Sequence, residues 1–180
     1  MADNKKSKKP LVLKQKPMIR MVYVLIPVFL ASVYFFGWRS LLVMAVVNIA
    51  GFLAEYLLCR SFKQQVSSAI FVTNMLFALS LPPTIPLWIA VVGIVFGVVF
   101  GKMVFGGFGK NVFNPAISGR AFIYISFGVP LTSAWVEPLQ GGAAGFTAFQ
   151  ADVVSGATPL VTLSDGGSVP ALNLLLGNTA

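Results

Sequence analysis

The sequence predicts an all-α membrane protein with about five transmembrane helices. Three observations lead to this class: 57% of the 180 residues are apolar, only 10% are charged, and the mean hydropathy is +0.85. A soluble domain carries roughly 25% charged residues, and a soluble fold of this composition would expose more apolar surface than water tolerates. The abundance of Phe, Val, Leu and Ile also excludes a disordered chain.

Two segments near the amino terminus approach the length that a bilayer requires, which is about 20 apolar residues for a core of about 30 Å. Residues 21–38 are uncharged and lie between Arg20 and Arg39. Residues 41–59 form the second predicted span, and its only charge is Glu55. Because both stretches are longer than the apolar core of a signal peptide, we expect them to remain in the protein.

Three shorter segments complete the predicted bundle, at residues 66–81, 87–101 and 121–131. The first stops at Pro82, since proline cannot continue a helix. The second ends before Lys102, which we assign to the following loop. We expect the third to extend backward toward Asn114 and Pro115.

The distribution of basic residues predicts the orientation. Residues 1–20 hold seven of the 13 Lys and Arg, and we expect this arm on the cytoplasmic side, at the anionic face of the bilayer. With five crossings, the arm and the loops 60–65 and 102–120 face inward and collect 12 basic residues, as cytoplasmic loops do. Residues 132–180 then lie outside and contain no Lys or Arg. The partner of the basic residues is therefore the lipid bilayer, and we expect no nucleic acid.

The residue types exclude several kinds of active site. The chain has no histidine and a single cysteine, Cys59, so an internal disulfide, the usual metal sites and histidine-based catalytic pairs cannot be built. We expect no metal and no catalytic side chain. A cofactor would have to supply any redox chemistry.

The loop between the fourth and fifth segments is apolar and rich in glycine. Gly106, Gly107 and Gly109 allow positive φ angles, whereas Asn114 and Pro115 suit a turn and a helix start. Irregular apolar backbone at membrane depth must pack inside protein or line a cavity. We therefore expect a re-entrant or broken-helix element whose helix start offers free amides to an anion or a polar cofactor group. The alternative is that the glycines only allow tight helix packing.

The tripeptide Asn114-Pro115-Ala116 is also similar to the pore motif of aquaporins. Aquaporins have two such tripeptides on opposed half-helices, whereas this chain has one, and Arg120 lies too far along to be the adjacent selectivity arginine. A channel or transporter half without a redox role is therefore the alternative function.

Glu55 needs its own explanation because a carboxylate in a transmembrane helix costs roughly 2.5 to 3.5 kcal/mol on insertion scales. Two interpretations stay open. The side chain points to the membrane interface and pairs with Arg60 or Lys63, or it belongs to an ion path or a quinone pocket.

Three stretches resemble a known family. They are FVTNMLFALSLPPTIPLW (71–88), GKMVFGGFGKNVFNPAISGRAF (101–122) and DVVSGATPL (152–160). In this order they resemble the NqrB/RnfD family, which comprises NqrB of the sodium-translocating NADH:quinone reductase and its homologue RnfD of the Rnf electron transport complex. The resemblance covers most of residues 45–160 and leaves open which of the two complexes applies.

The resemblance implies a covalent flavin. In both branches the threonine of the SGAT-like motif carries FMN through a phosphoester bond, which a separate flavin transferase forms. The matching positions are Asp152, Ser155, Gly156, Ala157 and Thr158. Thr158 lies in the segment that the charge pattern places outside, and the isoalloxazine of the flavin would do the redox work. The complete subunit is also expected to hold riboflavin.

The resemblance further implies a bacterial inner-membrane subunit that relays electrons within an ion-translocating oxidoreductase, with the other subunits of the complex as partners and a quinone as a further one. A partner subunit would handle the nicotinamide, since no dinucleotide fingerprint is present. In the quinone reductase, a Gly-Gly-x-x-Glu stretch is associated with the quinone-inhibitor region. Gly51 and Glu55 match it here, and Phe52 replaces the second glycine.

The chain is short for this family. Family members continue with further helices, so we expect this sequence to correspond to an amino-terminal half, one of two inverted repeats. A split gene, a broken reading frame and a partial sequence are all compatible with this expectation.

Overall fold

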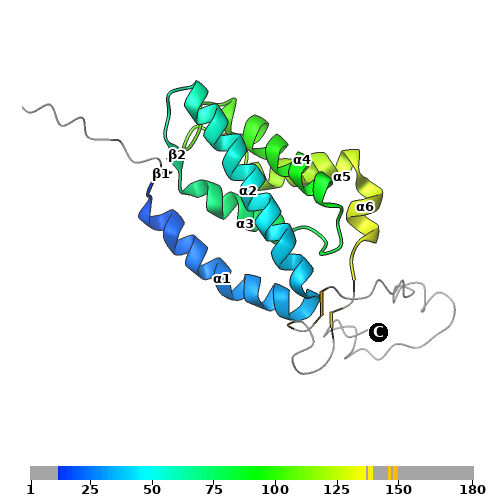
Figure 1. Cartoon of the computed structure of the whole chain (residues 1–180). Helices are drawn as coiled ribbons and strands as arrows, with labels where there is room; N and C mark the ends of the chain where they lie inside the picture. The colour runs from blue at the N-terminus through cyan, green and yellow to red at the C-terminus, as the bar shows by residue number, and fades with distance from the viewer. Residues whose placement is uncertain (1–11, 137, 140–145, 147, 150–180) are drawn as a thin grey trace, which may run out of the picture.

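The structure, a computed structural model, describes residues 12–136, 138–139, 146 and 148–149, and these form a helical bundle (Figure 1). The helices are α1 (Lys16–Phe36), α2 (Trp38–Ser61), α3 (Ala69–Leu79), α4 (Leu87–Val98), α5 (Pro115–Ser126) and α6 (Gly128–Ser133); a π-helical turn, η1 (Val99–Met103), continues α4. The prediction of a mostly helical, apolar chain is confirmed. Two short strands, β1 (Val12–Leu13) and β2 (Val66–Ser67), pair in parallel, with Val12 opposite Val66.

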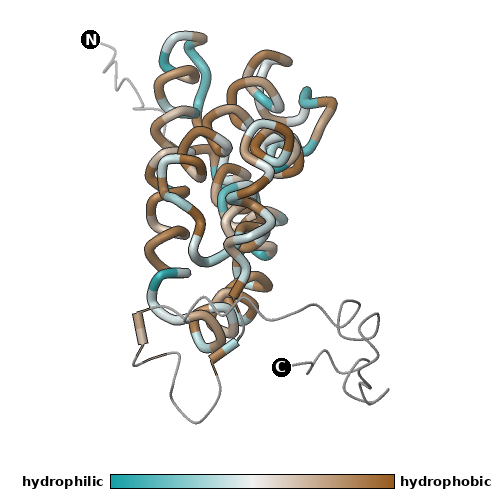
Figure 2. The backbone as a smooth tube through the Cα atoms, turned by 90° about the vertical axis from the view of Figure 1, so that its right-hand side faces the viewer, coloured by the Kyte–Doolittle hydropathy of each residue, from teal (hydrophilic) through white to brown (hydrophobic). Residues whose placement is uncertain are grey.

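The first two predicted spans correspond to the two long helices. Helices α1 and α2, of 21 and 24 residues, are long and apolar enough to cross a membrane. They meet at Gly37, whose φ of 83° suits glycine and few other residues. Figure 2 shows hydrophobic residues all along the bundle, and most of α1 leaves its side chains uncovered. Such a surface suits contact with lipid.

The remaining helices are short. At a rise of 1.5 Å per residue, α3 and α5 are about 16 and 18 Å long, against a bilayer core of about 30 Å. The expectation of one helix over residues 121–131 is wrong, because Phe127 (φ −135°, ψ 46°) separates α5 from α6. Pro130 has no amide hydrogen to continue α5, but it fits the first turn of a new helix. The number of membrane crossings stays a prediction.

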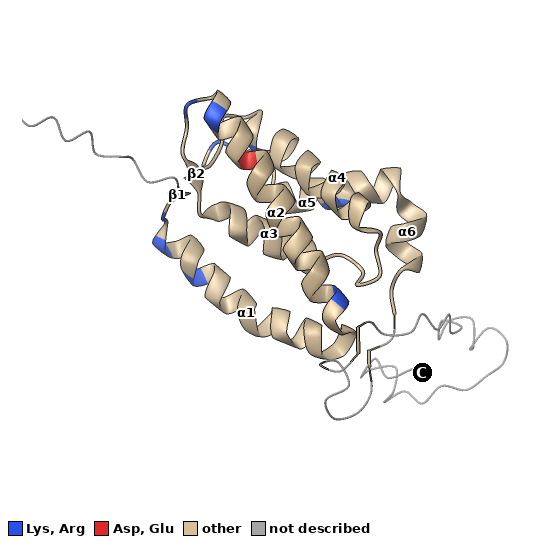
Figure 3. Ribbon diagram, viewed as in Figure 1, with Lys and Arg blue, Asp and Glu red and all other residues tan. Residues whose placement is uncertain are grey.

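Figure 3 shows most of the described Lys and Arg residues toward the end of the bundle that carries β1 and β2. Arg39 is the second residue of α2 and lies at the opposite end of that helix from Arg60. Its Nε donates to the carbonyl of Pro83 at 3.1 Å, and its Nη2 donates to those of Thr84 and Ile85, both at 3.3 Å. The guanidinium therefore holds the connection between α3 and α4 against the start of α2.

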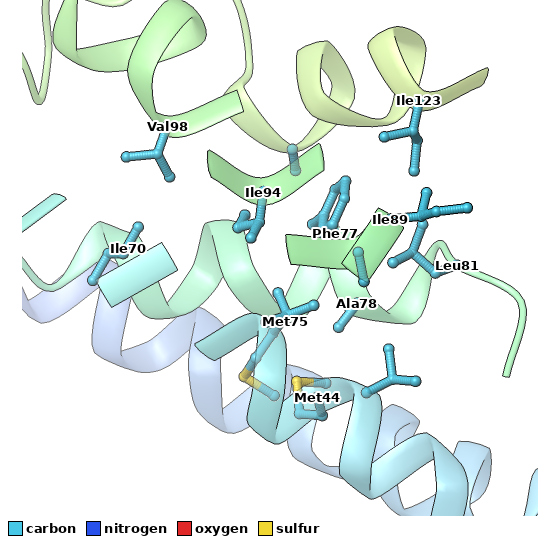
Figure 4. Close-up of a cluster of buried hydrophobic side chains, with 14 of the residues drawn as sticks. Met44, Ile70, Met75, Phe77, Ala78, Leu81, Ile89, Ile94, Val98 and Ile123 are labelled. Atoms are coloured by element: carbon cyan, nitrogen blue, oxygen red, sulfur yellow. The ribbon is translucent and has the colours of Figure 1, made fainter. Parts of the chain in front are cut away.

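The core lies where α3 and α4 meet α2 and α5 (Figure 4). Phe77 and Ile70 of α3, Ile94 of α4 and Ile123 of α5 are fully buried. Met44 extends this cluster toward α2. Burial of an aromatic or branched aliphatic side chain contributes about 1.5 to 3 kcal/mol, so this cluster holds the short helices together.

Helix α4 approaches α5 through glycines spaced four residues apart. Gly93, Gly97 and Gly101 lie on the side that meets α5, and a Cβ atom at Gly97 would lie 2.3 Å from the carbonyl oxygen of Pro115. Gly119 of α5 fits the same contact, since its Cβ would lie 2.5 Å from the oxygen of Gly93. Small residues at this spacing let membrane helices pack backbone to backbone.

Replacing Gly97 tests this packing. We expect Gly97→Ala to lower the free energy of unfolding by about 1 to 3 kcal/mol, since the added methyl group overpacks the contact with α5. Thermal unfolding of the detergent-solubilised chain measures the change. Gly128→Ala is the matched control, because a Cβ at Gly128 meets no atom within 4 Å. Equal melting temperatures for the two variants would contradict the close approach.

Candidate functional site

A buried ion pair joins α2 to the π-helical turn. The carboxylate of Glu55 and the ammonium of Lys102 lie 2.6 Å apart, and their side chains are only 1% and 3% exposed. The second carboxylate oxygen of Glu55 accepts a hydrogen bond from the backbone amide of Ser67 at 3.1 Å. Both oxygens of this buried carboxylate are therefore engaged.

This pairing corrects two expectations from the sequence. Glu55 does not pair with Arg60 or Lys63, which are both exposed. Lys102 does not belong to the loop that follows the fourth segment, because the helix continues to Met103 and buries it. An unpaired carboxylate inside the bundle would be costly, and Lys102 supplies the charge that compensates it.

The local backbone explains why these side chains meet. Gly51, Glu55 and Cys59 recur every four residues on the buried face of α2. On the other side, the amide of Val104 donates to the carbonyl of Val99 at 2.9 Å, the five-residue spacing of a π-helix. The extra residue of such a turn shifts the helical register, and π-helical turns occur frequently at functional sites.

A layer of polar groups lies behind Glu55. The hydroxyl of Ser67 donates to the side-chain oxygen of Gln15 at 3.2 Å. The backbone amide of Gln15 donates to the hydroxyl of Ser68 at 3.0 Å. These bonds join the segment before α1 to the start of α3, alongside the pairing of β1 with β2. Glu55 is therefore tied through the backbone amide of Ser67 to this polar layer as well as to Lys102.

Gly51 makes room for a buried amide. A Cβ atom at Gly51 would lie 2.2 Å from Oδ1 of Asn74, which is fully buried on α3. The Nδ2 of Asn74 donates to the backbone carbonyl of Asn48 at 3.4 Å. Among the described residues, Oδ1 of Asn74 has no hydrogen-bond partner. Gly51 and Glu55 thus lie on the same buried face of α2, and the missing side chain of Gly51 leaves room for Asn74.

A cavity of about 300 Å³ lies beside the ion pair. Its lining residues are Met18, Ala69, Val72, Thr73, Leu76, Lys102, Phe108, Asn111, Val112, Phe113, Asn114 and Pro115. Most of this wall is apolar, with a lysine and a few hydroxyl and amide groups, which is the usual composition of a small-molecule site. Lys102 is shared, since it both pairs with Glu55 and lines the cavity.

The glycine-rich loop forms one wall of this cavity. Gly106, Gly107 and Gly109 have φ angles of 103°, 91° and 82°, so their predicted positive φ is confirmed and tight helix packing is not their role. Phe108 and Phe113 line the cavity on one side while they stay substantially exposed. Irregular backbone with apolar side chains therefore lines a cavity here, and the re-entrant position of this loop in the membrane stays a prediction.

The start of α5 is capped by the chain itself. Oδ1 of Asn114 accepts a hydrogen bond from the amide of Ala116 at 3.0 Å, and Pro115 occupies the first turn, where its missing amide hydrogen costs nothing. The expected free amide at Ala116 is thus already used. Arg120 is exposed on α5. The Asn114-Pro115-Ala116 motif acts as a helix start, which accounts for it without a pore.

The predicted flavin-attachment residues lie outside the described residues. They are Asp152, Ser155, Gly156, Ala157 and Thr158. Their assignment therefore depends on the motif alone.

Sequence reasoning missed Lys102 and Asn74 as members of the site. Lys102 had a usable signal, since it lies between Gly101 and Met103 in a continuous apolar stretch and Glu55 requires a cation. The signal for Asn74 was weaker: its side chain is an amide within an apolar stretch of sequence.

Comparisons with known proteins show the family to which the chain is similar. The model of the NQR2, RnfD, RnfE family matches residues 10–180. The NqrB protein of the Na(+)-translocating NADH-quinone reductase of Klebsiella pneumoniae is 36% identical over 151 residues, 79% of this chain and 37% of that protein. Those of Azotobacter vinelandii and Neisseria meningitidis are 43% identical over 118 residues (66% and 29%) and 40% identical over 133 residues (74% and 32%). The chain spans about a third of the length of these relatives.

A double-mutant cycle measures the coupling between Glu55 and Lys102. We expect Glu55→Gln and Lys102→Met each to lower the free energy of unfolding by about 3 to 5 kcal/mol, because each leaves one buried charge without its partner. The double variant leaves no charge and should be more stable than either single variant. Unfolding in detergent is the measurement, and Lys110→Met, at an exposed loop lysine, should change stability by less than about 0.5 kcal/mol. Additive losses would show that the two side chains are not coupled.

Proposed function

Because the chain belongs to the NQR2, RnfD, RnfE family, we propose that it serves as a membrane subunit of an ion-translocating oxidoreductase of the NADH–quinone reductase type. The observation that carries this proposal is the position of Lys102, which is buried, paired with Glu55 and also part of a cavity wall. Such a site combines a carboxylate for an ion path with a cavity for a redox-active small molecule.

We assign the cavity to the head group of a quinone. A quinone is a flat apolar ring with two carbonyl oxygens, and a cavity of about 300 Å³ is at the lower end of the volumes that small ligands occupy. Phe108 and Phe113 offer aromatic surface for the ring. The ammonium of Lys102 and the amide of Asn111 can donate hydrogen bonds to its oxygens.

The chain's own residues have two tasks at this cavity. Lys102 stabilises the negative charge that an arriving electron places on a carbonyl oxygen, an effect that is strong where water is excluded. Glu55 holds the ammonium of Lys102 in position. Glu55 therefore acts on the ligand only through Lys102. As a second role, we assign the carboxylate of Glu55 to the ion path.

We further propose that Thr158 carries FMN, within the motif formed by Asp152 and residues 155–157. When bound, FMN supplies one-electron transfer, and the threonine is only its attachment point. In this arrangement residues 1–20 lie in the cytoplasm and Thr158 lies on the outer side of the bacterial inner membrane, where a flavin transferase would reach it. Other subunits of the complex would handle NADH or ferredoxin.

Mass spectrometry tests the flavin assignment. With a flavin transferase co-expressed, the intact chain should gain the mass of an FMN phosphoester and show a fluorescent band after denaturing electrophoresis. Thr158→Ala should abolish both signals, because the hydroxyl that forms the ester is removed. Thr162→Ala, in the same segment, should keep them. A fluorescent band in Thr158→Ala would refute the assignment, and an unmodified wild-type chain would favour the channel alternative.

Filling the cavity tests the quinone assignment. Ala69 lines the cavity and is buried, so Ala69→Leu should occupy part of the volume. We expect it to weaken the binding of a short-chain ubiquinone at least tenfold, about 1.4 kcal/mol, as measured by equilibrium dialysis with the detergent-solubilised chain. Ala121→Leu, on the exposed side of α5, is the control and should bind like the wild type. Unchanged affinity in both variants would place the quinone elsewhere.

A further inference from the structure

The cation that neutralises Glu55 belongs to the chain and borders a cavity. We propose that Lys102 is a movable internal counter-ion: its ammonium occupies the position of a monovalent cation at Glu55 and vacates it by turning into the cavity. The inference deepens the proposed function, since it rests on the ion path at Glu55 and on a ligand in the cavity. It assigns to Lys102 the task of closing the Glu55 site to external cations.

The surroundings of Glu55 suit a small hard cation. The ammonium of Lys102 lies 2.6 Å from one carboxylate oxygen. The backbone amide of the buried Ser67 donates to the other carboxylate oxygen, and the Ser67 hydroxyl lies 3.2 Å from the side-chain oxygen of the partly buried Gln15. Carboxylate, hydroxyl and amide oxygens are the ligands that hard cations prefer. The position now held by the ammonium therefore offers a replacing cation the carboxylate oxygen of Glu55 as a ligand.

Lys102 can move without a change in the backbone. Lysine carries its charge on a flexible four-carbon stem, and Lys102 is one of the residues that line the cavity. The backbone of η1 is held in place, because a Cβ atom at the preceding Gly101 would lie 2.9 Å from the Cα atom of Pro115. The hydroxyl of Thr73 and the amide of Asn111 also line the cavity and offer hydrogen-bond acceptors to the ammonium.

Charge balance supplies the driving force. One electron added to a ligand in the cavity brings one negative charge, which attracts the ammonium of Lys102. The buried carboxylate of Glu55 then has no cation beside it, which is a costly state. Uptake of one monovalent cation removes that cost. One negative charge has entered the cavity and one positive charge has entered the site of Glu55, so the region keeps its net charge. Lys102 thereby couples charge in the cavity to cation uptake at Glu55.

Salt-dependent stability of the detergent-solubilised chain tests the inference without quinone or flavin. Thermal unfolding is compared in sodium chloride, potassium chloride and choline chloride at equal ionic strength, since choline is too large for the site. The wild type should show the same melting temperature in all three salts. Lys102→Met should melt at least about 3 °C higher in sodium or potassium chloride than in choline chloride, because a cation that binds only the folded state stabilises it.

Two further variants separate cation binding from general destabilisation. Glu55→Gln/Lys102→Met should lose the salt dependence because it has no carboxylate, and Lys110→Met should behave like the wild type. If Lys102→Met yields no folded protein, Lys102→Gln replaces it, since its amide leaves the carboxylate unneutralised. Equal melting temperatures of the Lys102 variant in all salts, or a salt dependence that survives in the double variant, would overturn the proposal.

A matched pair of ligands tests the movement of Lys102 in the wild type. The anion of 2-hydroxy-1,4-naphthoquinone should make the melting temperature depend on sodium, whereas the neutral 2-methoxy analogue should not. A bound anion without any sodium dependence would overturn the movement. The salt experiment needs no ligand, so it tests this inference even if no quinone binds. Failure of the quinone assignment appears instead in the binding measurement with Ala69→Leu.

Discussion

A carboxylate buried in an apolar helical bundle must have a cation beside it, and this requirement organises the described part of the molecule. Glu55 and Lys102 lie 47 residues apart in the sequence, and their contact joins α2 to η1, the π-helical turn that continues α4. The same carboxylate accepts a hydrogen bond from Ser67, and the neighbouring polar layer extends to Gln15. One ion pair therefore connects the amino-terminal segment, the start of α3 and the π-helical turn.

The cavity is a consequence of how the short helices are arranged around this pair. Glycines bring α4 close to α5, and α5 begins only after the glycine-rich loop, which the positive φ angles at Gly106, Gly107 and Gly109 shape into a wall. The other walls come from α3 and from Met18 of α1. Close packing at α4 and open space beside Lys102 are thus parts of one arrangement, which suits a subunit that must hold both a charge and a ligand.

Several features could be predicted because they depend on local sequence. The apolar composition predicted helices, the glycines predicted positive φ angles, and Asn114 followed by Pro115 predicted the start of α5. The division of residues 121–131 was missed although Pro130 indicates it, since uniform hydropathy concealed the break at Phe127. The partner of Glu55 was also missed, because Arg60 and Lys63 are cations close to Glu55 in the sequence. Lys102 directly follows the predicted span 87–101 and was therefore assigned to a loop.

The helical, apolar character of the chain and its family membership follow from composition and motifs, which depend on residue identity and short-range order. The pairing of Glu55 with Lys102, the place of Lys102 in the cavity wall and the contact of Gly51 with Asn74 arise from the three-dimensional packing. These contacts depend on how α2, α3 and the π-helical turn cross in space, and residues far apart in the chain meet only through that crossing.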